Sequence, residues 1–207
     1  MPDPVLKALV ISCTLKASPA QSNTEALAKV VTDEMAKAGV ASQMIRLADL
    51  NIKPGVTSNE GDGDDWPQVL DALKAADILI VATPTWMGQA SSFCQRMMER
   101  LDALFEDMAE DGRPVPFDKA AGVVVTGNED GAHHIIGTVC QGLIDLGFTV
   151  PGQAWTYWHK GPGAGPDYLD DQEGHDWSDA VGRNAARNLV AVARVLKTHP
   201  LPKPEKA

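Results

Sequence analysis

Three polar or glycine-rich segments of this 207-residue chain each follow an apolar run and could together form one binding site. The first, residues 12–24, contains several hydroxyl side chains, one lysine and no glycine, and a helical pattern begins at Asn23. The free N–H groups at the start of a helix attract anions. Hydroxyl, ammonium and N–H donors in one segment favour a phosphate ligand. The candidate phosphate-binding residues are Thr14, Lys16, Ser22, Asn23 and Thr24.

Local spacing also allows a second interpretation of this segment. Ser22 and Glu25 have the S-x-x-E spacing of a capping box, which satisfies a helix start without any ligand. The additional hydroxyls and Lys16 favour the phosphate, because a capping box needs neither. The segment lacks the Cys-x5-Arg motif of low-molecular-weight tyrosine phosphatases and the glycines of the Walker A and GxGxxG motifs. Among the common occupants of such a loop, the monophosphate of FMN remains.

The second segment, PTWMG at residues 84–88, follows the apolar run 77–83. Pro84, Trp86 and Gly88 lie just beyond the carboxyl end of the predicted strand. A planar redox ring needs a flat surface and N–H donors, and this loop can supply both. Trp86 taken alone is more typical of a core or interface anchor.

The third segment is TGNEDG at residues 126–131, after another apolar run. Its glycines permit a close approach of the backbone to a ring, and Asn128 can donate to a ring carbonyl or cap the next helix. His133 and His134 fall in the first turn of that helix, where the helix dipole disfavours a protonated imidazole. We interpret them as surface residues, with a position beside the ring as the alternative. The candidate ligands here are Thr126, Gly127, Asn128 and Gly131.

The elements that must position these segments alternate along the chain. Predicted strands fall at 6–12, 42–47, 77–83, 119–127 and 148–158, and predicted helices at 23–38, 66–75, 91–108, 131–146 and 178–196. Continuously apolar strands are typical of a parallel sheet covered on both faces. Right-handed crossovers then predict an α/β fold, a three-layer doubly wound sandwich with a five-stranded parallel sheet in the order 2-1-3-4-5. In such a sheet the three segments meet beyond the carboxyl ends of the strands.

The composition of the chain limits its domain number, its partners and its cellular location. We expect one domain over residues 1–198 and a Pro-rich tail at 199–207. A net charge of −10 argues against nucleic acid as a partner. No run of about 18 apolar residues predicts a membrane span. The three cysteines have neither zinc-site nor disulfide-framework spacing, so we expect no metal and a cytoplasmic protein. The Gly- and Asp-rich stretch at 58–66 is predicted to be a solvated loop.

Together the three segments resemble the NADPH-dependent FMN reductase and multimeric flavodoxin (WrbA-like) family, which has a flavodoxin-like fold. The family places a Ser/Thr/Asn-rich loop, a P-x-Y/W-x-G loop and a T-G-rich loop after its first, third and fourth strands. The counterparts here are SNT at 22–24, PTWMG at 84–88 and TGNEDG at 126–131. The resemblance adds Thr85 and Met87 to the expected FMN contacts. The chain departs from the family where Lys16 replaces an arginine, so that this residue could bind phosphate only as a point charge.

The resemblance implies an oxidoreductase in which NADPH or NADH delivers a hydride to FMN, and a quinone, free flavin or similar small molecule accepts the electrons. It also implies a homodimer or homotetramer. No catalytic side chain is predicted, since the cofactor carries the chemistry. Two alternatives are a flavodoxin-like carrier, which binds FMN without oxidising NAD(P)H directly, and a flavin-free domain with a regulatory role. Residues 154–170 are predicted to form a loop near the flavin or a subunit contact.

Overall fold

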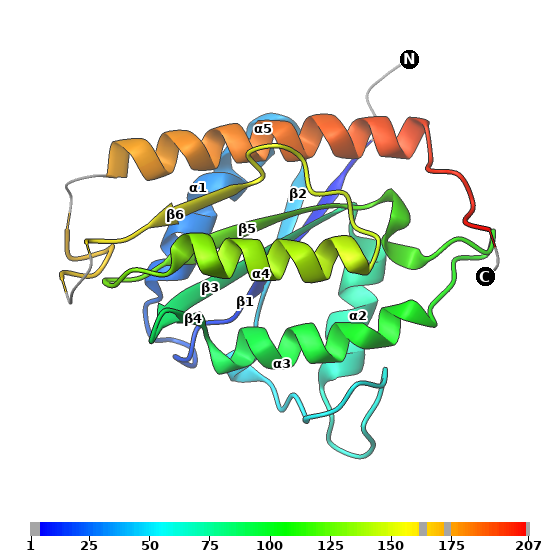
Figure 1. Ribbon diagram of the computed structural model, residues 1–207, viewed down its shortest axis with the longest axis horizontal. Coiled ribbons are helices and arrows are strands. Elements are labelled where there is room, and N and C mark those ends of the chain that lie inside the picture. The colour runs from blue at the N-terminus through cyan, green and yellow to red at the C-terminus, as the bar shows by residue number, and fades with distance from the viewer. Residues whose placement is uncertain (1–4, 162–164, 172–174, 206–207) are drawn as a thin grey trace.

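The computed structural model describes residues 5–161, 165–171 and 175–205, and its centre is a parallel sheet (Figure 1). The strands follow the order β2-β1-β3-β5-β6. All four pairings along this path are parallel. Their bounds are β1 (Lys7–Ser12), β2 (Ala41–Arg46), β3 (Ile78–Trp86), β5 (Ala120–Thr126) and β6 (Trp155–Trp158). Among these parallel strands the predicted flavodoxin-like order 2-1-3-4-5 is confirmed.

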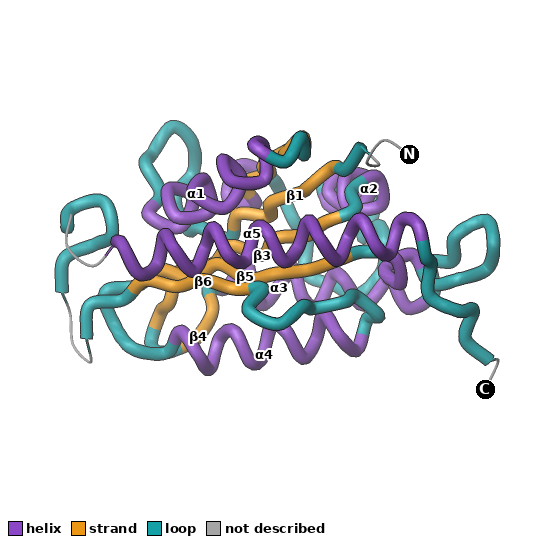
Figure 2. The backbone as a smooth tube through the Cα atoms, turned by 90° about the horizontal axis from the view of Figure 1, so that it is seen from above, coloured by secondary structure: helices purple, strands orange, loops and turns teal. Residues whose placement is uncertain are grey.

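Helices cover both faces of the sheet. One face packs against α1 (Asn23–Lys37) and α5 (His175–Thr198). The other packs against α2 (Trp66–Ala75), α3 (Ser92–Arg100) and α4 (Ala132–Asp145). Figure 2 shows α5 and α4 on opposite sides of the strands. In the described part of the chain, no helix has the length and apolar character needed to cross a membrane.

The prediction of a single helix over 91–108 is wrong. The α-helix ends at Arg100, and a 3-10 helix, η2 (Leu101–Phe105), follows it. Phe105 and Met108 continue the helical period of apolar residues but are 54% and 56% exposed, respectively. Because these side chains do not reach the core, burial does not favour continuing the helix through them.

A short hairpin at the end of β3 also differs from the prediction. β3 continues through Trp86, and β4 (Gln89–Ala90) pairs with it antiparallel. Met87 and Gly88 form the turn, with φ of 54° and 72°. Two residues at positive φ are typical of a type I′ turn, whose twist matches that of the strands. The segment predicted to be a loop is therefore a strand end followed by a tight turn.

The stretch at 58–66 contains a buried ion pair that the prediction of a solvated loop missed. Asp64 and Arg100 pair at 2.8 Å, and both side chains are 0% exposed. Arg100 also donates to the carbonyls of Lys53 and Thr57, at 2.9 Å to each. Its guanidinium lies 5.4 Å from the centre of the Trp66 ring. These contacts fix the long connection between β2 and α2 against α3, so the prediction is wrong for Asp64.

The described part of the C-terminal segment, residues 199–205, contains no helix or strand. The N–H of Leu201 donates to Asp118 at 3.0 Å, and its carbonyl accepts from Arg113 at 3.2 Å. These bonds attach the segment to the connection that precedes β5.

Candidate functional site

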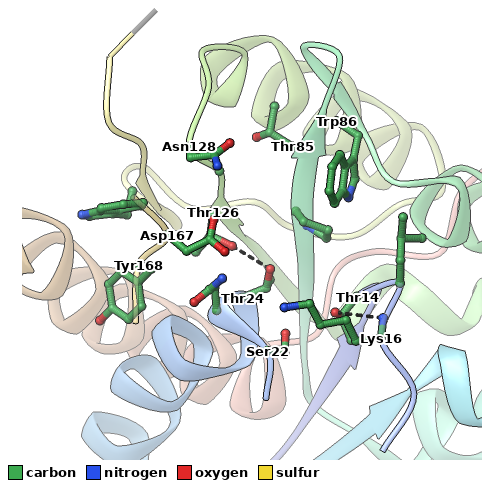
Figure 3. A pocket seen from close by; sticks show the side chains of 15 residues that line it. Thr14, Lys16, Ser22, Thr24, Thr85, Trp86, Thr126, Asn128, Asp167 and Tyr168 are labelled. Carbon is green, nitrogen blue, oxygen red and sulfur yellow. Dashed lines mark hydrogen bonds between the residues drawn. The ribbon is translucent and has the colours of Figure 1, made fainter. Parts of the chain in front are cut away.

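A pocket opens where the carboxyl ends of β1, β3, β5 and β6 meet the start of α1 (Figure 3). Every residue predicted to bind the cofactor lines it except Met87, Gly88 and Gly131. Four residues that were not among the predicted cofactor ligands also line the pocket: Leu15, Trp158, Asp167 and Tyr168. The fold thus brings the three sequence segments together and adds a fourth wall from Trp158, Asp167 and Tyr168. These three residues belong to the segment 154–170 that was predicted to lie near the flavin or a subunit contact, of which residues 162–164 lie outside the described residues.

The start of α1 retains donors that the protein does not use. Ser22 caps the helix, its hydroxyl accepting from the N–H of Glu25 at 3.3 Å. The carboxylate of Glu25 does not complete a capping box, because it binds Arg46 through two hydrogen bonds of 2.7 and 2.5 Å. Among the described residues, the N–H groups of Asn23 and Thr24 have no acceptor. Half of a capping box and an available anion site therefore coexist at this helix start.

The loop between β1 and α1 is held from outside the pocket. Arg46 donates to the backbone carbonyls of Lys16 and Ala20, at 3.3 and 2.9 Å. Ser18 donates through its hydroxyl and its N–H to Asp49, at 2.6 and 2.7 Å, and these bonds lower the pKa of Asp49. Neither Arg46 nor Asp49 belongs to a motif that could have indicated this role from the sequence. Their contacts fix the path of a loop that has no glycine and no regular structure.

Buried hydroxyls form the floor of the pocket. The side-chain oxygens of Thr24 and Thr126 lie 2.6 Å apart and join α1 to the end of β5. The hydroxyl of Thr85 is buried and has no partner in the described structure, and this residue is 5% exposed. A Cβ at Gly127 would lie 2.7 Å from the Cβ of Thr85, so glycine is needed there to leave room for Thr85. A buried hydroxyl without a hydrogen-bond partner destabilises the folded protein unless a ligand atom forms that hydrogen bond.

The two loops beyond β3 and β5 contact each other closely. A Cβ at Gly131, whose φ is +133°, would lie 2.7 Å from the carbonyl oxygen of Gly88. The N–H of Met87 donates to the carboxylate of Glu129 at 2.8 Å. The predicted residues Met87, Gly88 and Gly131 therefore shape the loops around the pocket without lining it.

Aromatic side chains stand on two sides of the pocket (Figure 3). Trp86 is 53% exposed at one side, whereas Trp158 and Tyr168 are buried at the other. The ring of Tyr168 stacks on His175 at 3.9 Å, and its hydroxyl donates to Asp179 at 3.0 Å. Burial and the neighbouring Asp179 raise the pKa of Tyr168, which keeps its hydroxyl protonated as a hydrogen-bond donor.

The two histidines considered in the sequence do not line the pocket. His134 shares a hydrogen bond of 3.0 Å with Gln89 in β4. His133 packs edge-on against Tyr157, with ring centres 4.9 Å apart. Both histidines are exposed, which agrees with the interpretation as surface residues.

The donors and surfaces of the pocket fit FMN. One end gathers hydroxyls, helix N–H groups and Lys16, which suit a phosphate, and the other combines aromatic rings with Asn128 and the unpaired hydroxyl of Thr85. No group of three or more His, Cys, Asp or Glu side chains suited to a metal ion occurs in the described parts of the chain.

Comparisons with known proteins agree with this geometry. The family model described as NADPH-dependent FMN reductase matches residues 6–163. The chain is 32% identical to the 8-demethyl-8-aminoriboflavin-5'-phosphate synthase of Streptomyces davaonensis, over 94% of this chain and 80% of that protein. The crystal structure of RosB with a bound 8-demethyl-8-formylriboflavin-5'-phosphate intermediate has a TM-score of 0.87 at 32% identity, covering 95% of this chain and 82% of that one.

One further relative is much longer. A protein of Mycobacterium bovis called a divalent metal cation transporter, MntH, is 36% identical over 93% of this chain. The chain corresponds to only 29% of that protein.

Proposed function

Because this chain belongs to the NADPH-dependent FMN reductase family, we propose that it binds FMN in this pocket, takes a hydride from NADPH or NADH, and reduces a quinone, free flavin or similar small acceptor. One observation carries the proposal: unused donors at the start of α1 and the unpaired hydroxyl of Thr85 border the same pocket. An anion-binding end and a ring-binding end in one cavity match the two parts of FMN.

The first part of the proposed binding site holds the phosphate. Thr14 and Ser22 offer hydroxyls, and α1 offers the N–H groups of Asn23 and Thr24. Lys16 extends into the pocket beside them and adds a positive charge (Figure 3). Helix N–H groups and the helix dipole stabilise an anion here without further rearrangement, because Arg46 already fixes the loop.

The second part orients the ring. Thr85 and Asn128 supply polar atoms for its carbonyl and nitrogen groups, and Trp86 supplies a flat apolar surface at the exposed side. When bound, FMN supplies the capacity to accept a hydride and to pass electrons on. The side chains of this pocket supply orientation and exclude water, and none of them needs to transfer a proton.

A second candidate function follows from the similarity to the Streptomyces davaonensis synthase and to RosB. In this case the pocket would hold FMN as a substrate whose ring is altered, rather than as a resident cofactor. The same contacts would serve either function, so the chemical fate of the flavin distinguishes them.

The first experiment is an absorbance spectrum of the purified protein after soaking with FMN and desalting, followed by anaerobic NADPH or NADH and then a quinone. We expect retained flavin bands that bleach with a nucleotide and return with the quinone. Retained bands that resist both nucleotides would instead indicate an electron carrier. Loss of the flavin on desalting contradicts the proposal. Mass spectrometry of the released flavin then reports whether its ring is unchanged, as the reductase requires.

The phosphate end can be tested by replacing its hydroxyls together, as Thr14→Ala, Ser22→Ala and Thr24→Ala. We expect FMN affinity to fall at least about tenfold, since several hydrogen bonds to a charged group are lost. The affinity for riboflavin, which lacks the phosphate, should fall much less in the same variant. Thr32→Ala is the matched control, because Thr32 lies on the same helix and its hydroxyl donates only to the carbonyl of Lys29. Unchanged FMN affinity in the triple variant would show that the phosphate binds elsewhere.

A further inference from the structure

Asp167 places a carboxylate in a pocket that otherwise suits an anion. It lines the pocket, and Figure 3 shows it between Asn128 and Thr24. Within the described residues, no hydrogen-bond donor or cation contacts its side chain. A carboxylate so placed accepts hydrogen bonds and repels a phosphate. Asp167 is half-buried, and a ligand group that binds it would be a hydrogen-bond donor and not the phosphate.

The backbone around Asp167 is held in position on both sides. The N–H of Leu169 donates to the side-chain oxygen of Asn23 at 3.0 Å, which ties the segment to the start of α1. The N–H of Gly165 donates to the carbonyl of Asn128 at 3.2 Å. The carbonyl of Asp167 itself accepts from the N–H of Asp170 at 3.0 Å. The carboxylate is thus presented to the pocket by a fixed turn.

The position of Asp167 lies between the two ends of the proposed FMN site. Lys16 and the start of α1 border the phosphate end, and Thr85 and Trp86 border the ring end. The group that joins phosphate and ring in FMN is a polyhydroxy chain, whose hydroxyls are neutral donors. Resting on the proposed function, we propose that Asp167 accepts hydrogen bonds from this chain and so selects flavins that carry it.

The test compares three flavins by fluorescence titration: FMN, riboflavin, which has the chain without the phosphate, and lumiflavin, which has only the ring. In Asp167→Ala we expect riboflavin affinity to fall about tenfold, because hydrogen bonds to a charged acceptor are lost. Lumiflavin affinity should stay within about twofold of the wild type. The affinity for FMN should fall less than the affinity for riboflavin, because the variant also removes a negative charge that repels the phosphate.

Asp170→Ala is the matched control, because it removes the same charge from the same segment while Asp170 lies outside the pocket lining. It should leave all three affinities unchanged. If the affinities for riboflavin and lumiflavin fell equally in Asp167→Ala, the proposal would be overturned, and Asp167 would instead contact the flavin ring. Unchanged riboflavin affinity, or a wild type that binds riboflavin no more tightly than lumiflavin, would also overturn it. A wild type that binds none of the three flavins contradicts the proposed function instead.

Discussion

The polar cluster around Arg100 and the polar groups of the pocket differ in whether they are paired within the protein. Around Arg100, the guanidinium binds Asp64 and the carbonyls of Lys53 and Thr57. In the pocket, the buried hydroxyl of Thr85 and the half-buried carboxylate of Asp167 have no partner in the described structure. In a paired cluster the loss of one partner is costly, whereas a buried polar group that has no partner costs stability until a ligand binds. Pairing, more than polarity, separates a structural cluster from a binding site here.

The largest expected effect comes from breaking the paired cluster with Arg100→Met. We expect the free energy of unfolding to fall by about 3–5 kcal/mol, because Asp64 is left buried without its cation. Urea unfolding followed by circular dichroism measures this. Arg96→Met is the control: Arg96 lies one turn earlier on α3 and donates a hydrogen bond to the carbonyl of Ile52. Equal losses in the two variants would contradict a special role for the buried pair.

The pH dependence of stability provides a second test of the ion pair between Asp64 and Arg100. Burial raises the pKa of Asp64, but hydrogen bonds from Arg100 and from the backbone N–H groups of Glu60, Trp66 and Lys53 outweigh this and hold it well below its usual value. A carboxyl group with a lowered pKa in the folded state contributes stability above its unfolded pKa, about 3.9, and loses it as the pH falls toward the folded value. The wild type should therefore lose more stability below about pH 4 than Arg100→Met does. The difference between their free energies of unfolding should become smaller as the pH falls.

Thr85→Val tests the unpaired cluster and has opposite effects on stability and binding. Removing a buried hydroxyl without a partner should raise the free energy of unfolding of the flavin-free protein by about 1 kcal/mol. FMN affinity should fall about five- to tenfold if the flavin forms a hydrogen bond with this hydroxyl. Urea unfolding and flavin titration measure the two effects.

A second threonine on β3 provides the control. The hydroxyl of Thr83 is buried and accepts from the N–H of Ser91 at 3.2 Å. Thr83→Val should therefore destabilise the protein by about 1–2 kcal/mol, because it leaves the N–H of Ser91 unpaired. If both substitutions shifted stability in the same direction, pairing would not be what distinguishes the two sites.

The smallest effect is expected at Met87, in the hairpin beside the pocket. Met87 has a positive φ of 54° and is 89% exposed. Asn tolerates this conformation better than Met, so Met87→Asn should raise the free energy of unfolding by about 0.5 kcal/mol. An FMN affinity within about twofold of the wild type would show that Met87 serves the turn. A larger loss would favour the cofactor contact that the family resemblance implies.

The order of the strands could be predicted because apolar β-branched runs alternate with helical patterns and parallel sheets have few allowed connections. The meeting of residues such as Lys16, Trp86 and Asn128 follows from the same rule, since loops after neighbouring strands share one edge. The hairpin at Met87 was missed because Met-Gly lacks the Asn or Asp that normally indicates such a turn.

The features that could not be predicted depend on partners far away in the sequence. Asp64 lies in a Gly- and Asp-rich stretch that is typical of a solvated loop, and its burial depends on Arg100, 36 residues later. The segment that holds Asp167 and Tyr168 was predicted to lie near the flavin or a subunit contact, but the sequence did not indicate that these two residues line the pocket. The N–H of Leu169 ties them to Asn23, 146 residues earlier. Trp158 could have been expected, since it ends the last strand at the carboxyl edge of the sheet.

Segment 165–171 lies outside the range 6–163 that matches the family model, yet Asp167 and Tyr168 form one wall of the pocket. A shorter chain that ended at the family boundary would keep the donors of α1 and the loops after β3 and β5. It would lose this wall together with α5, which packs against β5 and β6. If Asp167 has the proposed role, a substitution in this wall changes which flavins the pocket holds and leaves unchanged the strands and loops that match the family model.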